Sequence, residues 1–436
     1  MTKLPLNKLT ACLFLVACSA QAQVLQGTLT ELLQSSARVS AARSDEQASG
    51  ERAKEAFRRA WTPQVDVSLE SGQQRYATTT VPAANFEAVN RSTASVTQLI
   101  YDFGKSGSQI AESEALARQA RATGVATAEG LLLDGITAHW GVVRSRQVMD
   151  YASLSEASVR KQTQLENSMV ELGKGYESNV LQAKVQLATA EARRIRAEGA
   201  LQIAQARVGA VFGPLQSKVK YDEVAMPMPG LLPSSLEEAH KVALANNQQI
   251  QIGAIRSEAL RLRADGVRAR EFLPRLQVVG EAGRREGMDG LPGYVNDRKV
   301  MLQLQYNLNS GLAGNSAVEA AVKDWSASKS REDDARDLVL EQVTIAWRNL
   351  LVARSNRAIL SNQVVIASKF LEMASAERQL GRRSLLDILT AEMSLINAQS
   401  DLATTESDLA IAGLTLLQAM GRLNMSSVSF AKLAKP

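Results

Sequence analysis

The residue types that most often carry out chemistry are few in this 436-residue chain. Its only cysteines are Cys12 and Cys18, and its only histidines are His139 and His240. Both cysteines lie near the N-terminus, and each histidine lies in a helical pattern without a neighbouring cluster of carboxylates and histidines. The sequence has no phosphate-binding glycine loop, no nucleophile elbow and no HExxH pair. We therefore expect no enzymatic activity, no metal centre and no cofactor.

One acidic side chain is notable for its position. The stretch Leu380–Glu392 reads LGRRSLLDILTAE and places Asp387 in the apolar start of a helical run. A weaker copy, LGKGYESNVLQAK, lies 208 residues earlier (381 minus 173), at Leu172–Lys184. An acid in a first turn stabilises its own helix, whereas a ring of acids in a constriction attracts cations. The role of Asp387 therefore depends on the elements that carry the repeated turn.

The N-terminus has the features of a targeting segment. Lys3 and Lys8 give it a positive start, and the apolar stretch Leu9–Ala17 is too short to span a bilayer. Ala20–Ala22 fits a small-x-small cleavage site, which predicts a signal peptide over residues 1–22. No apolar run of ~20 residues follows, so we expect no transmembrane helix in the mature chain.

A second interpretation of the leader remains open. The residues Leu15–Cys18 (LVAC) resemble a bacterial lipobox, in which Cys18 would be lipidated. We favour cleavage after Ala22, because this site lies at a suitable distance from the apolar stretch of the leader. In both cases the mature chain has no free thiol, which excludes disulfides and cysteine metal sites.

The composition favours long helices over a compact enzyme core. Charged residues make up 22% of the chain, the net charge is +5, and aromatic residues make up only 4%. We find no basic run flanked by stacking aromatics and therefore predict no nucleic-acid partner. Ala, Leu, Gln, Glu and Arg, which dominate the sequence, are good helix formers.

Two helix-like runs each end at a proline. One covers residues 27–60 before Pro63, and the other covers residues 236–272 before Pro274. Because proline disfavours helical backbone in the residue before it, both helices should stop there, at helix–strand junctions. The second run opens with Ser235–Glu238 (SLEE), which predicts a capping box.

A pair of strands follows each proline. Alternating apolar and polar residues predict strands at about 64–74 and 92–102, and again at about 275–286 and 299–309. Their length of about 10 or 11 residues suits a tilted strand that crosses an outer membrane. A soluble hairpin is the alternative. Four such strands cannot close a barrel alone, but several copies of the chain could do so together.

Very long helical runs without proline complete each copy. They cover about 104–172 and 315–380, and shorter return helices cover about 179–212 and 385–420. At 1.5 Å per residue each long run would reach roughly 100 Å, which suits coiled coils and helical tubes. The expected organisation is a signal peptide 1–22, a first structural repeat 23–213, a linker or equatorial belt 214–233, a second structural repeat 234–421 and a C-terminal tail 422–436.

Taken together, these features resemble the TolC family of outer-membrane channel proteins, the outer membrane factors. The resemblance covers essentially the whole mature chain. It rests on the duplicated helix–strand–strand–helix–helix order, on Pro63 and Pro274, on the segment Tyr101–Gly104 (YDFG), and on Leu380–Leu389. The last segment is close to the family's G-x-x-(S/T)-x-x-D-V-L pattern.

The resemblance implies a mostly α fold with a small β part. Three copies would build a twelve-stranded outer-membrane β-barrel that continues as a long periplasmic α-helical barrel. The repeated turns would form the inner tip, where a periplasmic adaptor docks. The docking turns would comprise Leu172, Gly173, Lys174, Gly175, Leu380, Gly381, Arg382 and Ser384.

The resemblance also implies a gate at the tip. Its constriction would comprise Asp387, Thr390, Arg383, Arg378 and Asn179. With Asp387 facing the lumen, threefold symmetry would produce a ring of three acids that favours cations. The alternative is that Asp387 only stabilises its own helix.

This chain departs from the family pattern at several of these positions. Well-known members have a second acid where this chain has Thr390, and often an acid at the place of Asn179. Arg378 occupies a position that is tyrosine in some relatives. Arg383 matches an arginine that locks the closed tip, but its usual partner is missing. We therefore expect a weaker or rewired lock.

The notable candidates for a new lock partner are two acids in the first turn. Glu171 and Glu177 flank the docking residues of the first copy. Either carboxylate could replace the missing partner of the arginine.

The functional prediction is a passive exit duct in the outer membrane of a Gram-negative bacterium, extending into the periplasm. It would work as a homotrimer embedded in outer-membrane lipid, with a periplasmic adaptor (membrane fusion protein) and an inner-membrane ABC transporter or proton-driven pump. We favour type I secretion of a protein, such as a large adhesin. The alternatives are the outer-membrane component of a multidrug efflux pump and a structural periplasmic coiled-coil protein.

Overall fold

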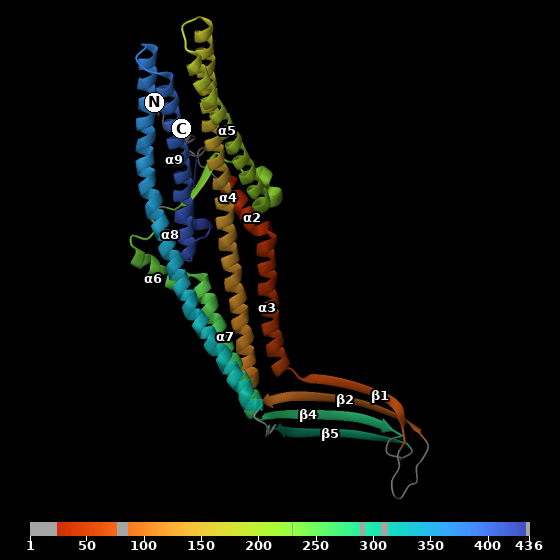
Figure 1. Cartoon of the computed structure of the whole chain (residues 1–436). Helices are drawn as coiled ribbons and strands as arrows, with labels where there is room; N and C mark the ends of the chain where they lie inside the picture. The colour runs from red at the N-terminus through yellow and green to blue at the C-terminus, as the bar shows by residue number, and fades with distance from the viewer. Residues whose placement is uncertain (1–23, 76–85, 229, 288–292, 307–312, 433–436) are drawn as a thin grey trace, which may run out of the picture. The chain divides into compact units, whose positions relative to one another are not determined.

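The structure is a computed structural model that describes residues 24–75, 86–228, 230–287, 293–306 and 313–432 (Figure 1). By its internal contacts the chain divides into two compact units. The first comprises Met1–Ser40, Val125–Gln248 and Arg336–Pro436, and the second comprises Ala41–Gly124 and Gln249–Ala335. Helices dominate both units, and the prediction of a mostly α fold with a small β part is confirmed.

Each of the two proline-terminated runs is two helices, which corrects the prediction of one. The helices are α2 (Val24–Ser35), α3 (Ala37–Trp61), α6 (Leu236–Asn246) and α7 (Gln248–Phe272). The breaks fall at Ser36 and Asn247, each 27 residues before its proline (63 minus 36, and 274 minus 247). Asn247 has extended backbone, and its side-chain amide donates to the carbonyl of Ala419 at 2.8 Å. A short polar side chain competes here with the helical hydrogen bonds.

The long helices are α4 (Lys105–Glu171) and α8 (Ala313–Gln379), with 67 residues each. Neither contains proline, so no backbone N–H is missing along either helix. The return helices are α5 (Glu177–Phe212) and α9 (Leu385–Ala419). In the first unit α4 and α5 form one helical hairpin, and α8 and α9 form another (Figure 1).

Four antiparallel strands make one sheet in the second unit. They are β1 (Gln64–Gln74), β2 (Glu87–Tyr101), β4 (Arg275–Glu286) and β5 (Tyr294–Gln305), in the order β1-β2-β4-β5. β2 and β5 each begin five residues before the predicted start, because polar residues that carry no alternation still pair across the sheet. The predicted end of the last strand, beyond residue 306, lies outside the described residues.

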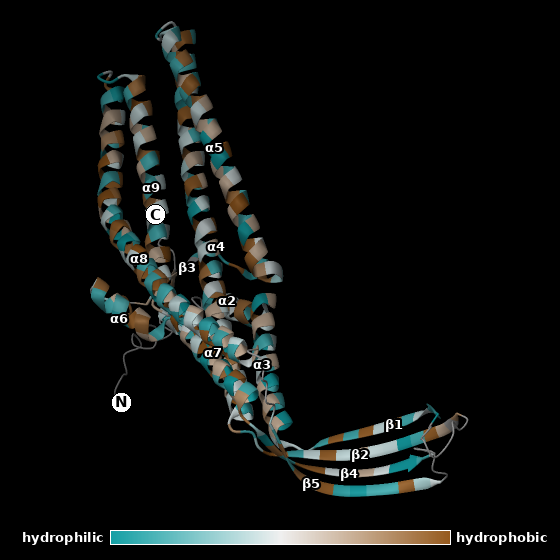
Figure 2. Cartoon of the chain, turned by 60° about the horizontal axis from the view of Figure 1, so that its bottom comes forward, coloured by the Kyte–Doolittle hydropathy of each residue, from teal (hydrophilic) through white to brown (hydrophobic). Residues whose placement is uncertain are grey.

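Apolar and polar residues are interleaved along the strands of this sheet (Figure 2), and the strand register places them on different faces. Facing residues of an antiparallel sheet share a face, and the register aligns Val65 with Val96, Val96 with Gly280, and Gly280 with Val300. This apolar face also carries exposed side chains at the outer strands, which are 65–81% accessible. They are Val65, Val67, Leu69, Val300, Leu302 and Leu304.

The opposite face of the sheet is polar. The register aligns Asp66 with Ser95, Ser95 with Glu281, and Glu281 with Lys299. Lys299 and Glu281 form an ion pair at 2.9 Å. Within the described residues β1 and β5 each pair on one side only, so the sheet has two free edges.

A second, two-stranded sheet was not predicted. β3 (Glu223–Pro227) lies in the linker between the copies and pairs with β6 (Val428–Lys432) near the C-terminus. Short 3-10 helices precede both strands, at Gly213–Lys218 and Met425–Ser427. Trp140 of α4 is buried and donates its indole N–H to the carbonyl of Ala225 at 2.8 Å, which fastens β3 to the long helix.

Close packing in the first unit depends on a glycine in α4. A Cβ at Gly135 would lie 3.0 Å from Leu29 Cδ2 and 3.2 Å from Leu32 Cδ2, so only glycine lets α2 approach this closely. Leu29 is fully buried and Leu32 almost fully. Among the described residues, no helix is both long and apolar enough to span a membrane.

Candidate functional site at the helical turns

The two repeated turns end their helices in the same way. Gly173 and Gly381 have φ values of +69° and +73°, the left-handed conformation that glycine adopts at little cost. The N–H of Gly173 donates to Val170 O at 2.9 Å, and that of Gly381 donates to Arg378 O at 2.8 Å. The next residue bonds one position further back in each copy, at 2.8 and 2.9 Å. This paired pattern is a Schellman motif, and it satisfies the last carbonyls of each helix.

The two turns differ where the return helix begins. Ser384 caps α9, because its hydroxyl accepts from the Asp387 N–H at 3.2 Å. Asp387 Oδ2 in turn accepts from the Ser384 N–H at 3.3 Å, which completes a capping box. The first copy has Tyr176 at the corresponding position, without a side-chain cap. Through this capping box Asp387 stabilises the start of its own helix. Its side chain is exposed, and the acidic ring remains a proposal.

Arg383 has a partner that the sequence analysis missed. Its Nε donates to Glu377 Oε2 at 2.6 Å, and its guanidinium lies 5.2 Å from the centre of the Phe370 ring. This contact lies within one chain, and a lock that uses Glu171 or Glu177 remains a prediction. Glu377 lies six residues before Arg383 on the other limb of the same turn. The pair ties α8 to the turn that follows it.

Arg378 joins the two hairpins. It forms an ion pair with Glu166 of α4, and the two side chains are only 22% and 6% exposed. In the structure Val159, Thr163 and Glu166 follow each other at helical spacing on one buried stripe of α4. An acid in such a stripe requires a partner.

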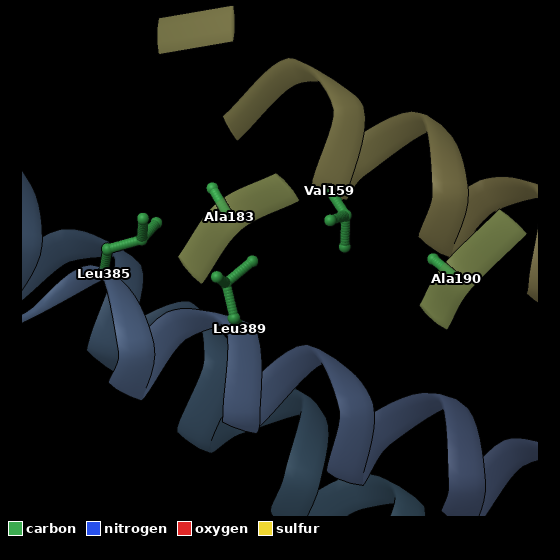
Figure 3. Packing of buried hydrophobic residues seen from close by; sticks show 5 residues of the cluster. All are labelled: Val159, Ala183, Ala190, Leu385 and Leu389. Carbon is green, nitrogen blue, oxygen red and sulfur yellow. The ribbon is translucent and has the colours of Figure 1, made fainter. Parts of the chain in front are cut away.

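A second polar link lies nearby. Ser158 of α4 donates its hydroxyl hydrogen to Glu392 Oε1 of α9. Around it α4, α5 and α9 meet in an apolar cluster that Figure 3 shows in close-up. The cluster comprises Val159, Ala183, Ala190, Leu385 and Leu389.

The remaining predicted gate residues make only local contacts. Thr390 is exposed and donates its hydroxyl to the carbonyl of Leu386 at 2.8 Å. Asn179 is half-buried, and its backbone N–H donates to Tyr176 O at 3.0 Å. In the described part of the chain neither side chain bonds to Asp387.

The predicted docking residues present an exposed surface at both turns. Leu172 and Leu380 are 70% and 71% exposed, and Lys174 and Arg382 are exposed as well. A Cβ at Gly175 would lie 3.0 Å from the Val170 backbone nitrogen, so this position also requires glycine.

The other predicted positions have simple structural surroundings. Pro63 and Pro274 lie between a helix end and a strand start, as predicted. His139 is fully buried and stacks on Tyr221 with ring centres 5.6 Å apart, and His240 Nε2 lies 2.9 Å from the Thr344 hydroxyl. Over the described ranges no three acids or histidines are placed to hold a metal ion. The signal peptide and Cys18 lie outside the described residues.

The family model described as outer membrane efflux protein matches residues 28–213 and 240–422. Each matched segment holds one copy of the helix–strand–strand–helix–helix order. The chain therefore belongs to the outer membrane efflux protein family, and the predicted resemblance to TolC proteins is confirmed. This is a family of passive channels rather than enzymes, and its members reside in the outer membrane of Gram-negative bacteria, as does this protein.

Three relatives illustrate the range of the family. The chain is 23% identical to the outer membrane efflux protein BepC of Brucella suis over 93% of this chain and 87% of that protein. It is 23% identical to the outer membrane protein TolC of Escherichia coli over 77% of this chain and 70% of that protein. It is 26% identical to the alkaline protease secretion protein AprF of Pseudomonas aeruginosa over 64% of this chain and 58% of that protein.

Solved structures have the same fold. The outer membrane protein VceC of Vibrio cholerae superimposes with a TM-score of 0.78 and 18% sequence identity. The match covers 91% of this chain and 96% of that chain.

Proposed function

We propose that this protein is the passive outer-membrane exit duct of a tripartite export machine. The observation that carries the proposal is the four-stranded sheet with an exposed apolar face and two free edges. Three copies, joined β1 to β5, would close twelve strands with the apolar face toward lipid and the polar face toward the lumen. Closure removes the free edges, which a single chain cannot do.

The helical turns are the inner end of this duct. A periplasmic adaptor docks on the exposed residues of both turns, and an inner-membrane ABC transporter or proton-driven pump supplies the energy. Family members work with such adaptors and inner-membrane partners, which supports this assembly. The chain itself performs no chemistry.

Two ion pairs replace the missing family lock. Arg378–Glu166 holds the hairpins together, and Arg383–Glu377 stiffens the second turn. The duct opens when the first of these contacts separates. Asp387 contributes an acidic ring that favours cations at the narrow end.

The cargo we propose is a protein delivered in one step by type I secretion. A similarity to a protease secretion protein supports this choice, and so do the short linker between the copies and the single gate acid. Multidrug efflux is the second candidate, which the similarity to an efflux protein favours.

Deletion of the gene separates the two cargo classes. The measurement compares secreted and surface proteins, and in parallel susceptibility to dyes, detergents and antibiotics. Loss of one large secreted or surface protein with unchanged susceptibility supports type I secretion. Sensitisation with an unchanged protein profile overturns that choice in favour of drug efflux, and both changes together indicate a shared exit duct.

A further inference from the structure

The contact between the two hairpins contains an acid to which the proposed function assigns no role. Glu392 of α9 reaches α4, where its Oε1 accepts the hydrogen bond from the Ser158 hydroxyl. Its other oxygen, Oε2, is buried and has no hydrogen-bond partner in the described part of the chain. One carboxyl group therefore bridges the hairpins while half of its bonding capacity is unused.

The surroundings of this carboxyl group are apolar. Val159 follows Ser158 on α4, Leu389 lies one turn before Glu392 on α9, and both apolar side chains are 1% exposed. Burial raises the pKa of Glu392, and the hydrogen bond from Ser158 partly offsets that rise. An ionised carboxylate here would leave a charged oxygen without a partner, which costs more than leaving a neutral group without one.

Charged side chains on the neighbouring elements do not compensate. Glu156 of α4 is bound by Arg160 and Arg194, and Arg160 also binds Glu191 of α5. Other charged groups on these helices are Arg193, which bonds Asn397, the capping Asp387, and the exposed Lys161 of α4, Lys184 of α5, and Lys369 and Glu372 of α8. In the described structure none of them contributes to the pKa of Glu392.

We propose that Glu392 is a proton-dependent pin between the two hairpins. The neutral carboxyl group holds α9 to α4 through Ser158, and loss of its proton loosens the contact. The inference rests on the proposed function, because separation of the hairpins is the movement by which the duct opens.

The direction of the pH effect follows from the raised pKa. The joined hairpins bind the proton of Glu392 more tightly than separated hairpins do. The joined state is therefore favoured at low pH, and this preference is lost as the pH rises through the raised pKa. The Glu166–Arg378 ion pair also joins the hairpins, so loss of the Glu392 contact loosens them around Glu392 without separating them entirely.

The test measures the distance between the hairpins directly. Gln164 on α4 and Ser394 on α9 are exposed, so cysteines there accept spin labels. Cys12 and Cys18 belong to the predicted leader, which leaves the introduced pair as the only free thiols. Labelled chains are diluted with unlabelled chains in lipid vesicles, and pulsed electron resonance then reports distances within one chain from pH 5 to pH 8.

The expected result is a short distance at low pH that broadens or lengthens as the pH rises. The ratio of joined to separated hairpins should change by up to about tenfold for each pH unit by which burial raises the pKa. Glu392→Gln should keep the short distance at every pH. Ser158→Ala removes the hydroxyl through which Glu392 holds α4, so it should weaken the short distance at low pH and reduce the pH step. The exposed control Glu372→Gln should match the unaltered protein.

Two outcomes would overturn the pin. One is a distance in the unaltered protein that does not change with pH, and the other is a pH step that persists in Glu392→Gln. Conductance in planar lipid bilayers tests the duct separately. If the protein shows the pH step but conducts at no pH, the proposed duct is wrong and the pin is not.

Discussion

The polar residues near the turns divide into those with local partners and those with partners on the other hairpin. Asp387 bonds to Ser384 three residues away, which stabilises one helix start. Arg378 and Glu166 are 212 residues apart in sequence, and their contact joins α8 to α4. The local contacts shape a turn, whereas the distant contacts determine whether the hairpins stay together.

Arg378→Gln should open the duct more easily, because it leaves the buried Glu166 without its cation. Removing one partner of a buried pair costs about 3–5 kcal/mol, and partial exposure of Arg378 should reduce this to about 1–3 kcal/mol. Single-channel conductance in planar bilayers and the denaturation midpoint report the effect. The exposed neighbour Arg382→Gln is the matched control.

The same pair allows a double-mutant cycle. Arg378→Gln combined with Glu166→Gln should cost less than the two single changes added together, because no unpaired charge remains. If the effects of the two single changes were strictly additive in the double variant, the two side chains would not interact to hold the hairpins together.

Asp387→Asn should lower the preference of the channel for cations. In the proposed trimer the change removes one acid from each of three copies at the narrow end. It retains most of the helix cap, so the loss of helix stability should be at most about 0.5–1 kcal/mol. The reversal potential in a salt gradient measures the selectivity. An unchanged reversal potential would mean that Asp387 only caps its helix. Glu372→Gln on the exposed face of α8 serves as the control.

At the scale of elements, three glycines lie in three different backbone environments. Gly381 reverses the chain with a positive φ and open space around it. Gly421 has a φ of +68°, and a Cβ there would lie 2.3 Å from Asn246 O, where the end of α9 meets the break between α6 and α7. Gly199 lies inside α5 with nothing within 4 Å of a Cβ.

These three positions predict stability changes of different sign. Gly199→Ala should stabilise by about 0.5–1 kcal/mol through helix propensity. Gly381→Ala should destabilise by about 1–2 kcal/mol through backbone strain alone. Gly421→Ala should cost the most, because the backbone of Asn246 must also move. Urea denaturation of the three variants measures the order, and a Gly421→Ala protein as stable as the unaltered one would contradict the packing described here.

Much of the element order was predictable, because the signals are local. Pro63 and Pro274 end helices through their own ring geometry, and β1 and β4 alternate within a single strand. The helix break at Asn247 was not predictable, since it depends on a hydrogen bond to Ala419, 172 residues away. The ion pair of Arg383 with Glu377 was not predicted, because the missing partner was expected in the first copy, whereas Glu377 lies on the same turn as Arg383.

At the scale of the whole molecule, the sheet has one face that suits lipid and another that suits water. Val67 and Leu69 lie on the apolar face of β1, and Ser68 lies between them on the polar face. A chain with this sheet has exposed apolar surface and free edges that only assembly can cover.

Leu69→Lys should therefore impair insertion and assembly in the membrane. A lysine on a lipid-facing strand position costs about 2–4 kcal/mol near the bilayer midplane. Ser68→Lys makes the same chemical change one residue away on the polar face and should be tolerated. Folding into lipid vesicles and the yield of heat-sensitive trimer on gels measure both. Equal effects of the two substitutions would contradict the assignment of the faces.

The sequence alone determined the duplicated order of elements, the helix ends at the prolines, the glycine turns and the family, because each depends on residues close together in the chain. Tertiary structure decided the pairing of β3 with β6 and the links Arg378–Glu166 and Glu392–Ser158. These contacts join segments that are far apart in sequence. Their free energy arises only when folding removes both partners from water, so neither segment alone contains a signal for its partner.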